Sequence, residues 1–455
     1  MKITALILAL FPLTLNAQID GEWYTSFIVM GTTGNIKIEI NSTFPSSITL
    51  SESDGAFGPI ILDEHKVEDK TIYFKWKAIN LLFKGVYSQK ESIIEGEMNQ
   101  NGVKWDVIFT KERPKNAILN RPQEPKEPFD YTIENVKIKN GKNTIGATLT
   151  LPRGFSESTS IVVLASGSGP QNRDCELVGH KPFWVIADHL TTNGIGCLRF
   201  DDRGVGESSG VFADTDLSDF ASDVVACVKY LRKVKKYKTN KIGLAGHSEG
   251  GMHTLMAATS YKKVDFIMQL AAVGTNGGDV LIEQQYLIPI KSGATEENAR
   301  WNQSVFADEV GIINKYNQKK AVAPLTKLLK SKYDTAPLEY KESMTKEIFV
   351  TSGLDFINND WARGFVQFST QDYLKKLKVP LFAATGSEDT QVPPVSNLAG
   401  FNAYSEASSQ VSSMGGLNHL MQTCKTCSIE EYGSLEETFS VELMDIMVTW
   451  INELD

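Results

Sequence analysis

The chain has 455 residues, of which 42% are hydrophobic and 22% charged, and its 46 basic and 55 acidic side chains give a formal net charge of −9. This composition excludes a wholly disordered, collagen-like or coiled-coil chain, and the acidic balance offers no basic surface to nucleic acid, so no nucleic-acid partner is expected. After the N-terminus no run of about 18 apolar residues occurs, so we expect no transmembrane helix.

The N-terminus has the pattern of a signal peptide. Lys2 supplies a positive charge, residues 3–15 are mostly apolar, and Ala17 is a small residue at a candidate cleavage site. We therefore expect residues 1–17 to be a signal peptide and the protein to be exported to the periplasm or the extracellular space. The alternative is a short buried helix or strand.

Residues 18–112 predict an all-β domain, because short segments with alternating apolar residues end at Gly, Asn, Asp or Ser. These segments are GEWYTSFIV, NIKIEIN, SSITLSE, TIYFKWKA, LLFKGVYS, SIIEGEM and VKWDVIFT. Many short strands of this kind are typical of a small β-barrel or sandwich. Residues 113–129 contain four prolines and little periodicity, which indicates an extended linker.

From residue 130 to residue 455, apolar runs alternate with helical patterns. The strand candidates are SIVVLASGSG, GIGCLRFDD, KIGLAGHS, DFIMQLAAV and PLFAATGSE, and the helical patterns between them include WVIADHLTTNG, LSDFASDVVACVKYLRK and GGMHTLMAATSYKK. This alternation predicts an α/β fold, with a mostly parallel sheet and helices on both faces. Ligands of such sheets bind beyond the carboxyl ends of the strands. Residues 276–375 are helix-prone and strand-poor, so we expect them to form a helical lid above those ends.

One motif in this region predicts a nucleophile. Gly246-His247-Ser248-Glu249-Gly250 lies between the strand-like KIGLA and the helix-like GMHTLMAATSY. A serine on a sharp strand-to-helix turn projects its hydroxyl from the sheet edge, and flanking glycines allow strand and helix to approach. The alternative is a chance match of Gly-x-Ser-x-Gly, which the strand–turn–helix context disfavours.

Ser248 needs a base that removes its proton. His419 lies after the last strand candidate and before the closing helix SVELMDIMVTWINEL, so it is the expected base. His180 follows the loop at Ser166 and is the alternative base, or a residue that lines the pocket. The other four histidines, His65, His189, His247 and His253, are expected to pack or to face solvent.

The base needs a carboxylate that orients it. Glu388 and Asp389 end the strand candidate FAATGSED, and Asp389 lies 30 residues before His419. Asp389 is preferred because it heads the loop before the VPP turn. The alternative role for a single acidic residue at the start of a loop is a turn cap.

A tetrahedral intermediate also needs backbone N–H donors. We expect one donor to be the N–H of Glu249, which follows the nucleophile at a helix N-terminus. The second should come from the small-residue loop 166–170, with Ser168 as the expected donor and Gly167 as the alternative. The rival interpretation is a phosphate-binding turn, but neither Gly-x-Gly-x-x-Gly nor Gly-Lys-Ser/Thr is present.

The five cysteines predict no metal site. Cys197 and Cys227 lie in apolar runs and are expected to be buried, and the odd number of cysteines leaves at least one unpaired. Cys424-Lys-Thr-Cys427 favours a local disulfide or two inert thiols over a redox pair or half of a zinc site, because no second pair exists.

Several motifs together resemble the α/β-hydrolase superfamily: GHSEG, FDDRGVGESSG, SGSGPQNRD, TGSEDTQVPP and GLNHLMQ. The chain order Ser248, Asp389, His419 also matches that fold. More narrowly, the chain from about residue 20 is similar to secreted bacterial serine carboxylesterases with an N-terminal β domain, often labelled as peptidases. The resemblance implies that these three residues form a catalytic triad, and it implies ion-pair roles near the site for Asp202 and Arg203.

The resemblance implies an exported serine hydrolase, a carboxylesterase that cleaves small acyl esters through an acyl-enzyme without cofactor or metal. The rivals are a peptidase with the same triad and a secreted binding protein with an inactive hydrolase body. Gly167, His180 and Trp361 are candidate pocket residues, although Asn359-Asp360-Trp361-Ala362-Arg363 lacks the proline of the family's Pro-Trp-x-Arg pattern. Nothing in the sequence indicates the oligomeric state.

Overall fold

The computed structural model describes residues 19–454 apart from 30–31, 43–45, 53–59, 63, 69, 77–80, 101–102, 114–119, 235–236 and 405–408. The predicted signal peptide, residues 1–17, lies outside the described residues. The chain divides into two compact units, Met1–Ile118 and Leu119–Asp455, and this division falls within the predicted linker. Among the helices of the described residues, none has both the length and the apolar character of a membrane span.

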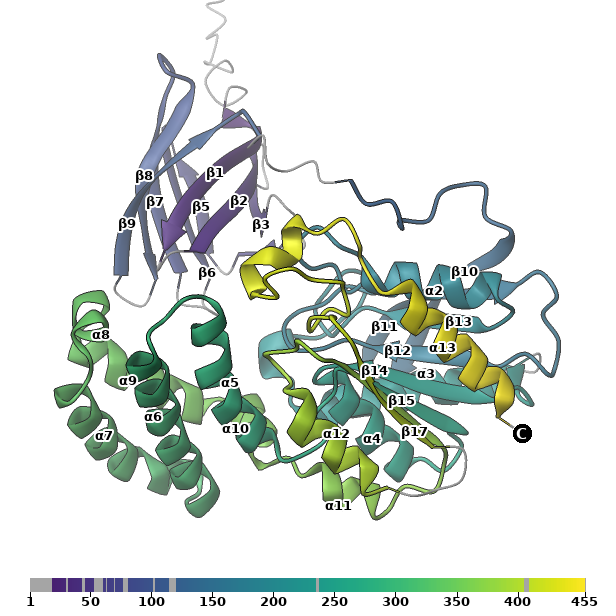
Figure 1. Cartoon of the computed structure of the whole chain (residues 1–455). Helices are drawn as coiled ribbons and strands as arrows, with labels where there is room; N and C mark the ends of the chain where they lie inside the picture. Colours follow the sequence, from purple (N-terminus) through teal and green to yellow (C-terminus); the bar gives the residue numbers. More distant parts are fainter. Residues whose placement is uncertain are drawn as a thin grey trace, which may run out of the picture. The chain divides into compact units, whose positions relative to one another are not determined.

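The described residues of the N-terminal unit form one nine-stranded antiparallel sheet with the strand order β4-β3-β2-β1-β9-β8-β7-β6-β5. Its strands are β1 (Gly21–Val29), β2 (Thr32–Asn41), β3 (Ser47–Glu52), β4 (Ile60–Ile61), β5 (Glu64–Glu68), β6 (Thr71–Trp76), β7 (Leu81–Ser88), β8 (Ile93–Gln100) and β9 (Val103–Thr110). The sheet curls so that β3 contacts β5, and alternate residues such as Trp23, Phe74 and Phe83 share one core (Figure 1). The predicted all-β domain is therefore confirmed. The sequence pattern missed β4, which is only two residues long, and β5, which reads EHKVE and has little apolar character.

The larger unit is built on an eight-stranded sheet with the order β10-β11-β13-β12-β14-β15-β16-β17. Its strands are β10 (Tyr131–Asn140), β11 (Asn143–Pro152), β12 (Ile161–Ala165), β13 (Gly196–Phe200), β14 (Ile242–His247), β15 (Phe266–Leu270), β16 (Leu381–Gly386) and β17 (Gln410–Met414). The strands from β13 to β17 pair in parallel, while β10 and β11 are antiparallel. All five predicted strands are present, and the hairpin β10–β11 and the edge strand β17 are additional.

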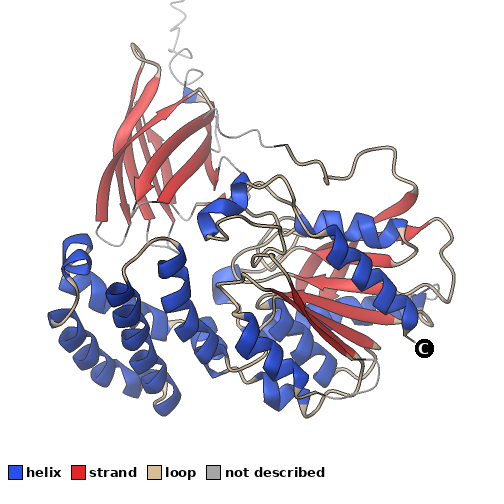
Figure 2. Ribbon diagram, in the orientation of Figure 1, coloured by secondary structure: helices blue, strands red, loops and turns tan. Residues whose placement is uncertain are grey.

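Helices cover both faces of this sheet, as predicted for the α/β class (Figure 2). Helices α2 (Pro182–Thr192) and α13 (Val441–Glu453) share one core, which includes Val162, Phe266 and Phe382 from the strands. Helices α3 (Leu217–Lys233) and α4 (Gly250–Ser260) pack into the core of the other face, to which α12 (Pro394–Asn402) contributes Phe401.

A helical insertion separates β15 from β16, where the lid was predicted. It comprises α5 (Gly277–Lys291), α6 (Glu296–Lys315), α7 (Gln318–Asp334), α8 (Leu338–Ser343), α9 (Lys346–Asn358), α10 (Asp360–Gln367) and α11 (Thr370–Leu374). Most of these helices share a core of their own that includes Ile313, Leu325 and Leu329. A short antiparallel bridge between Asn276 and Ser369 joins the start of α5 to the residue before α11.

Candidate active site

Ser248 lies at the junction of β14 and α4, with a positive φ of 55°. This left-handed conformation is strained for a residue with a side chain, and it persists only where neighbouring structure enforces it. Here the Ser248 N–H donates to the carbonyl oxygen of Leu270 over 2.9 Å. The serine is only partly buried, so its hydroxyl is available to a ligand.

The two glycines of the motif are required by close packing. A Cβ added to Gly246 would lie 2.2 Å from the carbonyl oxygen of Gly250, and one added to Gly250 would lie 2.2 Å from that of Ala165. No side chain fits at either position, so the strand, the helix and the end of β12 approach closely only because both residues are glycine.

The predicted base and acid are in contact. His419 Nδ1 lies 2.8 Å from Asp389 Oδ2, and both side chains are almost completely buried. A carboxylate can only accept, so Nδ1 carries the hydrogen and Nε2 is left for another partner. The other oxygen of Asp389 accepts the N–H groups of Gln391 and Val392, each over 2.8 Å.

The neighbouring acidic residue has a different environment. Glu388 is exposed, and its Oε2 lies 3.4 Å from Nζ of Lys291 on α5. Asp389 therefore combines the two roles that the sequence left open, because it orients the histidine and caps its own turn.

His247, directly before Ser248, contacts the backbone of His419, a contact that sequence reasoning missed. Its Nε2 lies 2.9 Å from the carbonyl oxygen of His419, and the two rings are 4.9 Å apart. Burial, together with the neighbouring His419, lowers the pKa of His247 to about 3. The ring is therefore neutral near pH 7, and Nε2 is its N–H.

The loop after β12 lies directly against Ser248. A Cβ added to Gly167 would lie 3.1 Å from Ser248 Cβ and 3.2 Å from the carbonyl oxygen of His247. Among the hydrogen bonds of the described residues, the N–H groups of Gly167, Ser168 and Glu249 donate to no protein group. The two expected donors, Ser168 and Glu249, are therefore available to a ligand, and Gly167 remains the alternative to Ser168.

Trp361 from the insertion reaches the residue after the nucleophile. Its indole Nε1–H donates to Glu249 Oε1 over 2.8 Å, and the Ser168 hydroxyl donates to Glu249 Oε2 over 2.5 Å. Trp361 therefore contacts the side chain of the residue that follows Ser248, and its pocket role stays a prediction. Other aromatic residues of the insertion, Trp301, Phe306, Phe349 and Phe356, pack against its separate core.

His180 does not reach this cluster. It is fully buried, with Nδ1 2.9 Å from Thr438 Oγ1 and Nε2 3.1 Å from the carbonyl oxygen of Tyr432. Burial lowers its pKa to about 4. Since both ring nitrogens are engaged within the protein, His180 is a packing residue, and neither the base nor the pocket role suggested by the sequence is supported.

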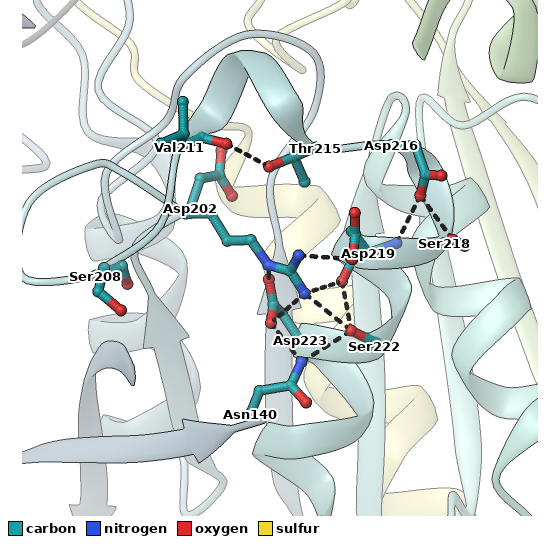
Figure 3. A network of polar contacts seen from close by, with 12 residues as sticks. Asn140, Asp202, Ser208, Val211, Thr215, Asp216, Ser218, Asp219, Ser222 and Asp223 are labelled. Carbon is teal, nitrogen blue, oxygen red and sulfur yellow. Dashed lines mark hydrogen bonds and ion pairs between the residues drawn. The ribbon is translucent and has the colours of Figure 1, made fainter. Parts of the chain in front are cut away.

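Arg203 forms ion pairs with Asp219 and Asp223, which Figure 3 labels, as the resemblance implied, whereas among the described residues Asp202 forms none. Arg203 Nε lies 2.6 Å from Asp223 Oδ2, and its Nη1 lies 2.6 Å from Asp219 Oδ1. Asp202 instead accepts the Ser166 hydroxyl over 3.1 Å and the Gln171 N–H over 2.9 Å. Asp202 thus fixes the loop that carries Ser168.

The cysteines follow the favoured interpretation. Cys424 and Cys427 form a disulfide, and Cys175, Cys197 and Cys227 are free and buried. In the described part of the chain, no group of three or more His, Cys, Asp or Glu side chains is arranged to hold a metal ion.

Comparison with known proteins yields one family and several distant relatives. The family model described as serine aminopeptidase, S33, matches residues 183–423, which include Ser248, Asp389 and His419. Esterase EstD of Thermotoga maritima is 31% identical over 145 residues, 32% of this chain and 33% of EstD. An uncharacterized 31.7 kDa protein of the traX-finO intergenic region of Escherichia coli is 22% identical over 273 residues, 59% of this chain and 84% of that protein. The Pyrococcus furiosus esterase Pf2001 is similar in structure, with a TM-score of 0.42 at 14% identity over 71% of this chain and 93% of its own.

Proposed function

This chain belongs to the α/β-hydrolase family described as serine aminopeptidase, S33, and on that premise we propose that it is a serine carboxylesterase. The observation that carries the proposal is the buried 2.8 Å contact between His419 Nδ1 and Asp389 Oδ2, joined through His247 to the strained turn of Ser248. A nucleophile, a base and an orienting carboxylate in this arrangement are the requirements of acyl transfer.

In the proposed reaction Ser248 Oγ attacks the acyl carbonyl of an ester, and His419 Nε2 takes the serine proton. The backbone N–H groups of Ser168 and Glu249 bind the oxygen that becomes negative in the tetrahedral intermediate. The intermediate collapses, and the alcohol leaves with the proton from His419. A water molecule, deprotonated by His419, then hydrolyses the acyl-enzyme and restores Ser248.

A serine aminopeptidase is the second candidate, because the family is named for that activity. Such an enzyme must bind the substrate's α-ammonium group, which a carboxylate near the nucleophile would do. Glu249 is the acidic residue next to Ser248, but it is 1% exposed and already accepts hydrogen bonds from Ser168, His253 and Trp361. Its commitment to these partners favours an ester substrate, and EstD, a relative, bears the name esterase.

Export is part of the proposal. The pattern of residues 1–17 supports it, and so does the Cys424–Cys427 disulfide, since such bonds persist mainly in oxidising compartments. Fractionation of cells that express the tagged chain is expected to recover a shortened protein outside the cytoplasm. Recovery of the full-length chain in the cytoplasm would contradict export without touching the proposed chemistry.

A fluorophosphonate probe tests the nucleophile. The wild type is expected to be labelled, and Ser248→Ala is expected to lose both labelling and about 99.9% of ester turnover with an unchanged Tm. The control is Ser260→Ala at the far end of α4, which should label like the wild type. If the wild type is not labelled, the proposal is overturned and the alternative of a secreted binding protein with an inactive hydrolase body is favoured.

A substrate panel then separates the two enzymes. We expect short p-nitrophenyl esters to be hydrolysed with a higher kcat/KM than aminoacyl anilides, and activity to fall as the acyl chain lengthens. A higher kcat/KM for the anilides would make the protein a peptidase and overturn the carboxylesterase assignment.

A further inference from the structure

The Glu249 carboxylate joins three separate elements of the larger unit. Its Oε2 accepts the hydroxyl of Ser168 from the loop after β12 over 2.5 Å, and its Oε1 accepts the indole N–H of Trp361 from α10 over 2.8 Å. Oε1 also lies 3.1 Å from His253 Nε2, one turn along α4. Since a carboxylate only accepts, His253 Nε2 must be the N–H. No part of the reaction proposed above uses this side chain.

The three hydrogen-bond donors around Glu249 stabilise its negative charge. Burial alone raises the pKa of the carboxyl, but the hydrogen bonds from His253, Ser168 and Trp361 and the attraction of His253 outweigh burial, so the pKa lies below its usual value. A buried carboxylate is tolerated only where donors surround it. The His253 ring is itself fixed by stacking on Phe220 of α3, with the ring centres 5.1 Å apart. His253 on α4 therefore holds the carboxylate independently of the loop that carries Ser168 and of the insertion.

Helix α10, which carries Trp361, is held in place by hydrogen bonds at its start and to the end of α6. Asn359 caps α10, because its side chain accepts the N–H of Ala362 over 3.1 Å, and this cap places Trp361 in the first turn of the helix. Arg363, in the same helix, donates to the carbonyl oxygens of Ile313 and Tyr316 at the end of α6. The position of α6 and α10 is thus tied to the active site through the indole of Trp361.

We propose that Glu249 is a positioning residue whose carboxylate sets the two oxyanion donors relative to each other and latches helix α10 of the insertion beside the nucleophile. The inference rests on the proposed function. The residue that donates one oxyanion N–H from its backbone holds, through its side chain, the hydroxyl of the residue that donates the other. The carboxylate has two arms, one to Ser168 and one to Trp361, and their consequences are separable.

The Ser168 arm should act on the transition state. Ser168→Ala retains the backbone N–H but removes the hydroxyl that holds it in place, so we expect kcat for a short p-nitrophenyl ester to fall about tenfold while KM changes less than twofold. The Ki of an alkyl boronic acid, whose tetrahedral adduct places an oxygen between the same donors, should rise by a similar factor. Ser168→Thr, which keeps a hydroxyl, should recover most of the loss.

The Trp361 arm should act on substrate binding. Trp361→Phe keeps an aromatic ring but removes the N–H, so α10 is less firmly held and we expect KM to rise about fivefold with kcat within twofold of wild type. The matched control is Trp301→Phe in the core of the insertion, because among the described residues the indole nitrogen of Trp301 is buried without a hydrogen-bond partner. That control should leave both constants unchanged. Glu249→Gln, whose amide nitrogen cannot accept, should lower kcat and raise KM together.

The outcomes separate this inference from the proposed function. If the wild type is not labelled by a fluorophosphonate, both are overturned. If the wild type is active but Ser168→Ala keeps its kcat and boronic acid Ki, the positioning role is overturned and the carboxylesterase remains. A lower Tm for Ser168→Ala and Trp361→Phe with unaltered kcat, KM and Ki would reduce Glu249 to a structural residue and also overturn the inference.

Discussion

His247 donates its Nε2–H to the carbonyl oxygen of His419 over 2.9 Å. The residue before the nucleophile therefore holds the backbone of the proposed base, while Asp389 holds its ring. Because burial and the neighbouring His419 lower the pKa of His247 to about 3, this N–H stays a neutral donor across the pH range in which a serine hydrolase works. The residue next to the proposed nucleophile is thus hydrogen-bonded to the proposed base, and the protonation state of His247 does not change over this pH range.

Replacing His247 tests this contact. His247→Phe keeps a ring of similar size but removes the N–H, so we expect kcat for a short ester to fall about tenfold, in line with one hydrogen bond that positions a catalytic group. His247→Gln retains a donor and should recover part of the loss. His189→Phe is the control, since His189 binds Asp445 on α13. An unchanged kcat for His247→Phe would show that the loop of His419 keeps its position without the hydrogen bond from His247.

The acidic pair after β16 gives a second prediction. Asp389→Asn should lower kcat about ten-thousandfold, because the amide favours the wrong tautomer of His419. Glu388→Gln, one residue earlier and exposed beside Lys291, should stay within twofold of wild type. Steady-state kinetics on one ester decide between them, and the reverse result would move the orienting role to Glu388.

Asp202 gives a prediction for pH. Burial raises the pKa of Asp202 to about 8, although hydrogen bonds from Gln171 and Ser166 oppose the shift. Between about pH 4 and pH 8 the folded protein therefore keeps a proton that the unfolded chain has lost, and this group makes the free energy of unfolding fall as pH rises. The side chain of Asp202→Asn does not titrate. The free energy of unfolding of the wild type minus that of the variant should therefore decrease between about pH 4 and pH 8.

Chemical denaturation at pH 5 and pH 8 measures this difference. His180 and His247, whose pKa values are lowered to about 4 and 3, make stability rise with pH below about 6.5, but they are present in both proteins and cancel in the comparison. The control is Asp130→Asn, an exposed residue paired with Arg153. A difference between wild type and Asp202→Asn that stays constant from pH 5 to pH 8 would contradict the raised pKa.

The last prediction concerns the start of the larger unit. The Arg121 guanidinium donates to the carbonyl oxygens of Val178, Gly179, Gly433 and Leu435. The predicted linker is thus bound to the catalytic unit at this residue. Arg121→Met should lower the free energy of unfolding of that unit by about 2 kcal/mol, because charged hydrogen bonds to partly buried carbonyls are lost. Urea denaturation measures the change, with the exposed Lys126→Met as the control.

Truncation extends the same test. A chain that begins at residue 119 retains Arg121 and should keep fluorophosphonate labelling and stability, whereas one that begins at residue 128 should label but unfold at lower urea. Equal midpoints for the two truncated chains would show that the bonds of Arg121 add no stability.

The sequence predicted those parts of the site that carry local signals. Asp389 follows an apolar strand and His419 lies between the last strand candidate and a closing helix, and the structure brings these two side chains together. The assignment of Ser248 as the nucleophile stays a prediction. The contact of Glu249 with Trp361 joins residues 112 positions apart, and no local pattern records it. His180 was misjudged for the same reason, because its partner Thr438 lies 258 positions away.

Two of the missed strands, β10 and β17, lie at the edges of the sheet, whereas the third, β11, is internal and mostly buried, and edge position does not explain why it was missed. β10, with the sequence YTIENVKIKN, buries only Ile138, and it pairs with β11 alone at the end of the sheet. β17, at the opposite edge, reads QVSSM and buries little. Edge strands need apolar residues on one face at most, whereas the central strands β12 to β16 are buried along their whole length.

The bridge between Asn276 and Ser369 has a consequence for how far changes within the insertion can spread. The Gly277 N–H donates to the carbonyl oxygen of Phe368 and the Thr370 N–H to that of Thr275, over 2.9 and 3.1 Å, so the segment from α5 to α10 begins and ends at one point. Part of this segment has a core of its own, while Val280, Phe365 and Phe368 pack in the core that includes the strands. A change confined to the separate core of the insertion is therefore expected to leave the turns after β14 and β16, which carry Ser248 and Asp389, in place.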